Sequence, residues 1–179
     1  VDMPVGNTFV GMVDRDEFDP WLRQRAADAG AHLRIGAFKN LHYDDEGIVH
    51  IDYQSKESGL ENISVTTRSV IGADGARSKV ARQSDPCSKD LRSVHAYHEI
   101  AEAPETDTER YDGDRCDVWY QGELSPDFYA WVFPHGKHAS IGVGSEADGF
   151  SARQSVATLR AKTGLDTCQT VRREGAPIP

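Results

Sequence analysis

One feature restricts most strongly what this chain can fold into. It consists of many short strand-like segments separated by turn residues, and few segments are long enough to be helices. One amphipathic helix is expected over residues 16–29, capped by Asp14 or Asp16, and a second over residues 151–162, ended by Gly164. A turn at residues 44–47 joins two of the strands in a hairpin. Strands are expected at 32–35, 39–43, 48–53, 63–65, 69–71, 94–100, 117–122, 128–133 and 139–144.

The order of these segments predicts a mixed α/β (α+β) fold in two parts. A helix, several strands and a short helix capped by Ser78 make up the first part. The second part is a mostly antiparallel sheet whose strands alternate between two faces. Residues 83–90 are polar and contain Pro86, which marks a boundary between the parts.

An excess of acidic residues limits the partners that this chain can have. Its 179 residues include 20 Lys+Arg and 29 Asp+Glu, which gives a formal net charge of −9. Nucleic acid requires a basic face, so we expect no nucleic-acid partner. Three widely spaced cysteines favour a reducing, cytoplasmic setting over a disulfide framework. The histidines lack metal-ligand spacing, so we expect no metal site.

A run of small residues from Val70 to Ser78 is the first stretch that can carry chemistry. Gly72 and Gly75 allow a ligand to approach the backbone closely, and Asp74 can accept a hydrogen bond from a hydroxyl group. The helix that starts after Ser78 offers backbone N–H groups to an anion. The alternative is a tight strand-to-helix turn in which these residues serve only the geometry of the backbone.

Alternating aromatic residues between Pro126 and Pro134 are the second such stretch. Tyr129, Trp131 and Phe133 are expected to project from one face of a strand, because successive side chains of a strand point to opposite faces. A row of three aromatic rings suits a long apolar ligand such as a polyprenyl chain. The alternative is an ordinary sheet core.

These stretches resemble parts of one group of flavoproteins. Residues 70–78 resemble the Asp-Gly fingerprint of flavin-dependent oxidoreductases of the para-hydroxybenzoate hydroxylase superfamily, and residues 13–22 are similar to a stretch in which an arginine before a helix approaches the flavin. Residues 126–134 match the Pro-x-x-Tyr-x-Trp-x-Phe-Pro motif of the geranylgeranyl reductase family at every specified position. With residues 128–144 and 172–179, the chain resembles the chlorophyll and bacteriochlorophyll branch, although Ala130 replaces an expected glycine.

The resemblance implies an enzyme that uses FAD and NADPH to saturate the geranylgeranyl double bonds of (bacterio)chlorophyll, or of geranylgeranyl diphosphate, to the phytyl form. It implies that Arg15, Asp74 and Gly75 bind the cofactor. It also implies that Tyr129, Trp131 and Phe133 bind the prenyl substrate. The proton donor stays unassigned, because the phenol of Tyr129, with an ordinary pKa of about 10, is a weak acid for this task.

The resemblance also implies how the chain is divided. Residues 14–90 correspond to the middle part of an FAD-binding domain, and residues 91–179 to an antiparallel-sheet substrate domain that is incomplete at its C-terminus. Residues 1–13 correspond to a strand leading in from that second domain. The family's Gly-rich fingerprint and its later Gly-Asp motif are not found. We therefore expect a central piece of a longer protein, which binds FAD weakly or not at all by itself.

Three other functions stay open at this point. The same fold can reduce prenyl ether lipids such as digeranylgeranylglycerophospholipid. An aromatic-ring flavin monooxygenase shares the Asp-Gly stretch but does not need the aromatic row. A prenyl- or pigment-binding module without redox activity would keep that row. We expect a cytoplasmic protein, with peripheral contact at the photosynthetic membrane and the oligomeric state left open.

Overall fold

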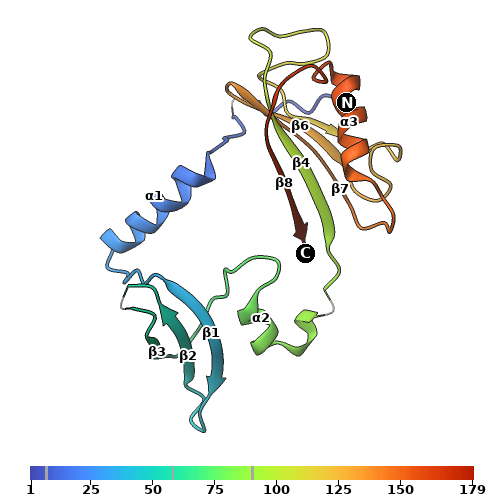
Figure 1. Ribbon diagram of the computed structural model, residues 1–179. Coiled ribbons are helices and arrows are strands. Elements are labelled where there is room, and N and C mark those ends of the chain that lie inside the picture. Colours follow the sequence, from blue (N-terminus) through green and yellow to red (C-terminus); the bar gives the residue numbers. More distant parts are fainter. Residues whose placement is uncertain (7, 58, 90) are drawn as a thin grey trace. The chain divides into compact units, whose positions relative to one another are not determined.

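The computed structural model describes residues 1–6, 8–57, 59–89 and 91–179, and the chain forms two compact units (Figure 1). The first unit consists of Val1–Asp74 and Ser78–Asp85, and the second of Gly75–Arg77 and Pro86–Pro179. Both contain helices and antiparallel strands, so the predicted mixed α/β class is confirmed. The assignment of the parts to flavin and substrate domains stays a prediction.

The first unit is built around a three-stranded antiparallel meander. Helix α1 (Arg15–Asp28) precedes strands β1 (Gly36–Tyr43), β2 (Val49–Ser55) and β3 (Asn62–Thr67), which pair in the order β1-β2-β3. The hairpin turn predicted at residues 44–47 joins β1 to β2. There the Asp44 carboxylate accepts hydrogen bonds from the backbone N–H groups of Glu46 and Ile48, and Gly47 adopts a φ of +78°.

Helix α2 (Lys79–Ser84) is tied to strand β1 through one side chain. The amide of Gln83 accepts a hydrogen bond from the backbone N–H of Leu41 at 2.7 Å and donates one to the carbonyl of Lys39 at 3.2 Å. Gln83 thus satisfies backbone groups of an edge strand that lacks a neighbour on that side. As a result, helix α2 is anchored to the meander of its own unit.

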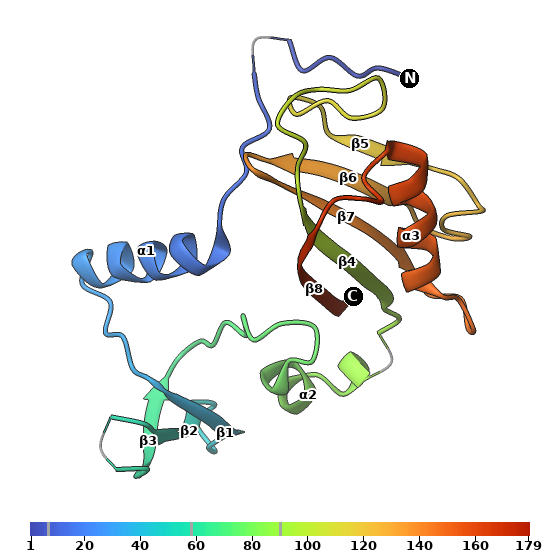
Figure 2. The ribbon, with the colours of Figure 1, turned by 45° about the horizontal axis from the view of Figure 1, so that its top comes forward.

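The second unit is a five-stranded antiparallel sheet covered by a helix on one face (Figure 2). The sheet order is β5-β6-β7-β4-β8, and a 3-10 turn (Pro86–Lys89) precedes it. The helix is α3 (Ala152–Thr163), which ends at Gly164 with a φ of +73°, as predicted. The strands are β4 (Val94–Glu102), β5 (Asp117–Trp119), β6 (Ala130–His135), β7 (His138–Ser145) and β8 (Thr170–Ile178).

The core of the second unit lies between the sheet and α3. Val132 and Ile141 point inward from β6 and β7 and meet Val156 and Leu159 of the helix, all of them 2% exposed or less. Along β6 the side chains alternate strictly between buried and partly exposed. The sheet therefore has one face that packs against α3 and another face that does not belong to this core.

Several expectations about secondary structure are wrong. Residues 32–35 and 69–71 are not strands. The pairing of β1 begins at Gly36 and that of β3 ends at Thr67, so neither segment is paired with a neighbouring strand. No strand was expected after residues 139–144, yet residues 170–178 form β8. Pro177 is tolerated because β8 is an edge strand, where a missing N–H leaves no partner unsatisfied. Helix α1 has no buried residue, so its apolar face covers no core here.

Candidate functional site

The aromatic row lies on the face of the second unit's sheet that α3 leaves uncovered. Tyr129, Trp131 and Phe133 are partly exposed, whereas the intervening Ala130 and Val132 are buried in the core on the opposite face. The rings of Tyr129 and Trp131 meet edge to face at 6.0 Å, and those of Trp131 and Phe133 stack at 6.1 Å. The three aromatic side chains therefore form one surface, as their alternation predicts, and that surface is not the main core.

Two glycines of β7 allow aromatic rings to lie flat on the sheet. A Cβ atom at Gly142 would stand 2.2 Å from the indole of Trp131, and one at Gly144 would stand 2.6 Å from the ring of Phe128. Phe128 in turn stacks on Tyr129 at 4.2 Å. The glycines are needed for this close approach rather than for an unusual φ. Phe128 thus extends the row beyond the residues that the sequence identified.

A chain of polar side chains runs alongside the row. The indole Nε1 of Trp131 lies 3.1 Å from the hydroxyl of Ser140, which lies 2.9 Å from Nδ1 of His98. The other ring nitrogen of His98 lies 3.0 Å from a carboxylate oxygen of Glu174. Four neighbouring strands, β6, β7, β4 and β8, contribute one residue each. The sequence analysis assigned His98 no role, because its partners are 42 and 76 residues away in the sequence.

The opposite face carries a buried ionic network that holds α3 to the sheet. Arg160 of α3 donates to the Glu99 carboxylate at 2.5 Å, and these side chains are only 9% and 13% exposed. Burial acts to raise the pKa of Glu99, but hydrogen bonds from Tyr97, Arg160, Arg173 and Thr170 outweigh it, and the pKa lies below its ordinary value. The network is structural, because every named partner belongs to the sheet or to the helix it anchors.

The Asp74 carboxylate caps the start of helix α2. It accepts a hydrogen bond from the Ser78 hydroxyl and one from the backbone N–H of Lys79 at 2.7 Å. The Ser78 hydrogen bond is the main reason that the pKa of Asp74 lies below its ordinary value. Ser78 itself accepts from the N–H of Ala81, as its predicted capping role requires. The expectation that these N–H groups are available to an anion is therefore wrong, because the turn uses them itself.

The other two residues implied in flavin binding are exposed. Gly75 adopts a φ of +82°, and a Cβ atom placed there would meet nothing within 4 Å. Arg15 begins helix α1 and forms a forked ion pair with Asp19, at 2.6 and 2.8 Å, while its side chain stays 79% exposed. The structure brings the three aromatic residues together. It gives Arg15 and Asp74 separate local partners, so their shared role at a flavin stays a prediction.

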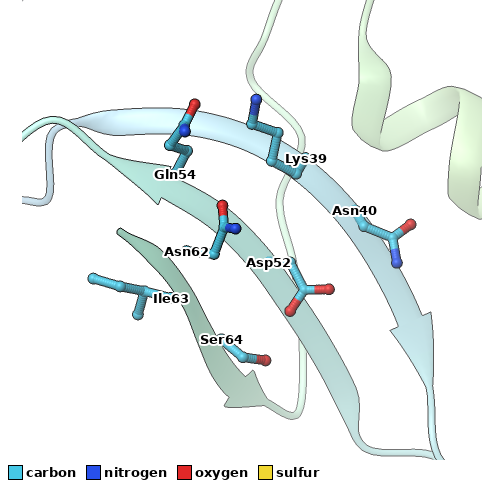
Figure 3. A pocket seen from close by; sticks show the side chains of 7 residues that line it. All are labelled: Lys39, Asn40, Asp52, Gln54, Asn62, Ile63 and Ser64. Carbon is cyan, nitrogen blue, oxygen red and sulfur yellow. The ribbon is translucent and has the colours of Figure 1, made fainter. Parts of the chain in front are cut away.

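A broad hollow lies over the meander of the first unit (Figure 3). It measures about 620 Å³, and all its lining side chains except Ile63 are polar, with Lys39 and Asp52 among them. A smaller hollow of about 250 Å³ lies near Glu146 and Phe150 in the second unit. The aromatic row lines neither. The polar lining of the larger hollow does not suit a prenyl chain, and binding of the prenyl substrate by the aromatic row stays a prediction.

Comparison with known proteins defines the family. Residues 1–160 match the FAD binding domain family, and the chain belongs to that family. A geranylgeranyl diphosphate reductase of Rhodobacter capsulatus is 50% identical over 179 residues, which is 100% of this chain and 44% of that protein. A digeranylgeranylglycerophospholipid reductase of Methanopyrus kandleri is 31% identical over 153 residues, 83% of this chain and 38% of that protein.

The fold comparison agrees with the sequence comparison. The crystal structure of a geranylgeranyl bacteriochlorophyll reductase-like protein from Thermoplasma acidophilum superposes with a TM-score of 0.75 at 25% identity, covering 92% of this chain and 42% of that chain. The resemblance predicted from the motifs is thus confirmed. The chain spans less than half the length of the relatives it matches. Among the described residues, no helix is long and apolar enough to cross a membrane.

The turn before α2 leaves room for an FAD cofactor. Small side chains in the turn before α2 leave the backbone open on the Gly75 side, where a flavin can approach without displacing a neighbouring atom. The exposed guanidinium of Arg15 carries the positive charge that a phosphate attracts. Gly75 faces open space, whereas Arg15 is already paired with the Asp19 carboxylate, with which a phosphate would have to compete.

Proposed function

We propose that the protein containing this chain is an FAD-dependent reductase that saturates the geranylgeranyl double bonds of (bacterio)chlorophyll or of geranylgeranyl diphosphate to the phytyl form, with NADPH as the source of electrons. The aromatic row on the sheet face opposite α3 is the observation that carries this proposal. Tyr129, Trp131 and Phe133 offer apolar surface on a face that the core does not use. The family of FAD-binding domains and the names of the relatives support the same reaction.

The chemistry explains why such a face is useful. The double bonds of a prenyl chain are isolated and unactivated, so their saturation requires a hydride at one carbon and a proton at the other. FAD, once reduced, supplies the hydride. In our proposal, the rings of Tyr129, Trp131 and Phe133 hold the chain by apolar contact and exclude water around the reacting bond. Arg15, Asp74 and Gly75 hold the cofactor.

Mass spectrometry of the product tests the proposal. The full-length protein is supplied with geranylgeranyl-bacteriochlorophyll or geranylgeranyl diphosphate, FAD and NADPH. We expect stepwise gains of two hydrogens, and comparing the two substrates shows which one is used. A product that gains oxygen would instead indicate a flavin monooxygenase, and binding without a change of mass would indicate a prenyl- or pigment-binding module. Either result would contradict the proposal.

A second candidate is the reduction of prenyl ether lipids. The Methanopyrus kandleri relative is named for that activity and is 31% identical over 83% of this chain. The Rhodobacter capsulatus relative matches at 50% identity over the whole chain, which favours the pigment or diphosphate substrate. Both reactions use an isolated prenyl double bond, so either places the same demand on the aromatic face. We also propose peripheral contact with the membrane, where such apolar substrates reside.

A further inference from the structure

Four side chains form a hydrogen-bonded line across the aromatic face of the second unit. Trp131, Ser140, His98 and Glu174 are joined in that order by contacts of 3.1, 2.9 and 3.0 Å. The imidazole centroid of His98 lies 6.3 Å from the ring of Trp131, so the histidine borders the surface proposed to hold the prenyl chain. The line lies outside the core and outside the Glu99–Arg160 network, both of which are on the other face of the sheet.

The chemistry of the four groups fixes the direction of each hydrogen bond. An indole N–H can only donate and a carboxylate can only accept, so Ser140 accepts from Trp131 and Glu174 accepts from Nε2–H of His98. In neutral His98, Nδ1 therefore accepts the hydroxyl hydrogen of Ser140. When His98 is protonated, Nδ1–H donates to the Ser140 oxygen instead, and the hydroxyl hydrogen is released to donate elsewhere. Protonation of His98 thus turns Ser140 into an outward donor.

We propose that His98 supplies, through the Ser140 hydroxyl, the proton that completes reduction of the prenyl double bond. This inference rests on the proposed function. Saturation of one C=C bond forms two C–H bonds. One uses a hydride, which carries two electrons and leaves the flavin oxidised. The other uses the hydroxyl proton of Ser140, whose oxygen takes the Nδ1 proton of His98 as that bond forms, which leaves His98 neutral. Atoms and electrons then balance, and His98 regains its proton from water.

The surroundings of His98 suit a reusable proton donor. Imidazole is the side chain that ordinarily exchanges a proton near neutral pH. The His98 side chain is 26% exposed and Glu174 is 46% exposed, so water reaches the carboxylate end of the line. Next to His98 on this face, Glu174 is charged, and its other carboxylate oxygen lies 3.1 Å from Nε of Arg172. Glu102 of β4 and His138 of β7 lie farther along the same face, where they are paired in register. Ser140 and Trp131 contribute neutral groups from β7 and β6.

Steady-state kinetics of the full-length protein provide the first test. We expect His98→Gln to lower kcat for prenyl reduction by about 10²–10⁴-fold, with little change in KM or in bound flavin. His95→Gln is the matched control, because His95 lies on the same strand but on the opposite face. Ser140→Ala should lower kcat as well, and Ser140→Thr, which keeps a hydroxyl, should restore most of it. Wild-type kcat in His98→Gln would overturn the assignment.

The Trp131 indole provides a readout that does not depend on turnover. Its N–H donates to Ser140, so a change in the Ser140 hydrogen bonds should shift the ¹⁵N–¹H resonance of the indole. In protein labelled with ¹⁵N-tryptophan, we expect this resonance to titrate with pH in the wild type and in His95→Gln, but not in His98→Gln or Ser140→Ala. Trp131→Phe assigns the resonance. A titration that survives in His98→Gln would overturn the proposed coupling.

The two tests separate this inference from the function on which it rests. If the wild-type protein adds no hydrogen to any prenyl substrate, the proposed function fails and the proton-donor role fails with it, whatever the indole resonance does. If the wild type reduces the substrate and His98→Gln does so equally fast, only the proton-donor role fails. If reduction is slowed in His98→Gln but not in His95→Gln, and the titration is lost with it, both stand.

Discussion

Gly142→Ala should displace Trp131 from the sheet and thereby damage the proposed prenyl surface. The added Cβ would stand 2.2 and 2.5 Å from two indole carbons and 2.6 Å from Cβ of His98. Carbon atoms pack favourably at about 3.5 Å or more, so the indole must move by roughly 1.3 Å. A shift of that size breaks the 3.1 Å hydrogen bond to Ser140.

The expected cost of Gly142→Ala follows from these contacts. Overpacking ordinarily costs about 1–3 kcal/mol, and the lost hydrogen bond adds about 1 kcal/mol. We therefore expect the unfolding free energy of the full-length protein to fall by about 2–4 kcal/mol in denaturant titrations, and KM for the prenyl substrate to rise. Gly122→Ala is the control, because a Cβ there meets nothing within 4 Å and its φ is not in the left-handed region. A Gly142→Ala protein with wild-type stability and an unshifted Trp131 indole resonance would refute this reasoning.

Three further predictions concern the other features of the two units. Gly75→Val should lower FAD occupancy, because it fills the open side of the turn and disfavours the φ of +82°; flavin absorbance per mole of protein measures this, and an unchanged value would count against the role of Gly75. Asp74→Ala should destabilise α2 by about 1 kcal/mol through loss of its cap, and wild-type stability of that variant would argue against the capping role. The pKa of Glu99 is lowered in the folded state, so its contribution to stability is present above its unfolded pKa and lost as pH falls through the folded pKa. Glu99→Gln should therefore weaken the fall of the unfolding free energy toward acid pH. An equally steep fall in the variant would contradict this prediction.

The strands and their faces were predictable wherever local pattern decides them. The alternation at Tyr129, Trp131 and Phe133 placed the aromatic rings on one face, and the turn at Asp44 and the stop at Gly164 have local chemical causes. Pairing partners were less accessible. Strand β8 was missed because Pro177 is acceptable only in an edge strand. The sheet order that makes β8 an edge depends on residues far away in the sequence.

The candidate site divides in the same way. The aromatic row carries a periodic signal, but the line from Trp131 through Ser140 and His98 to Glu174 carries none, because it joins one residue from each of four strands. Ser140, Gly142 and Gly144 repeat small residues at every second position of β7. Together with the aromatic residues at every second position around β6, this pattern could have indicated that the two strands share one face. At the Asp74 turn, the prediction that the N–H groups of the helix start are available to an anion was wrong. Which group accepts from those N–H groups depends on side-chain geometry, which the sequence does not give.

The prenyl KM of Trp131→Ala, measured beside that of Val132→Ala, tests most directly whether the aromatic face holds the substrate. Val132 is 2% exposed on the core face, so its truncation should cost about 2–3 kcal/mol of stability and leave KM unchanged. Trp131 is only partly buried, so its truncation should cost less than the roughly 3–5 kcal/mol of a fully buried ring, while KM rises or different double bonds are reduced. If Trp131→Ala unfolds the protein while turnover per folded molecule and KM stay normal, the row is merely part of the fold and the central claim is contradicted.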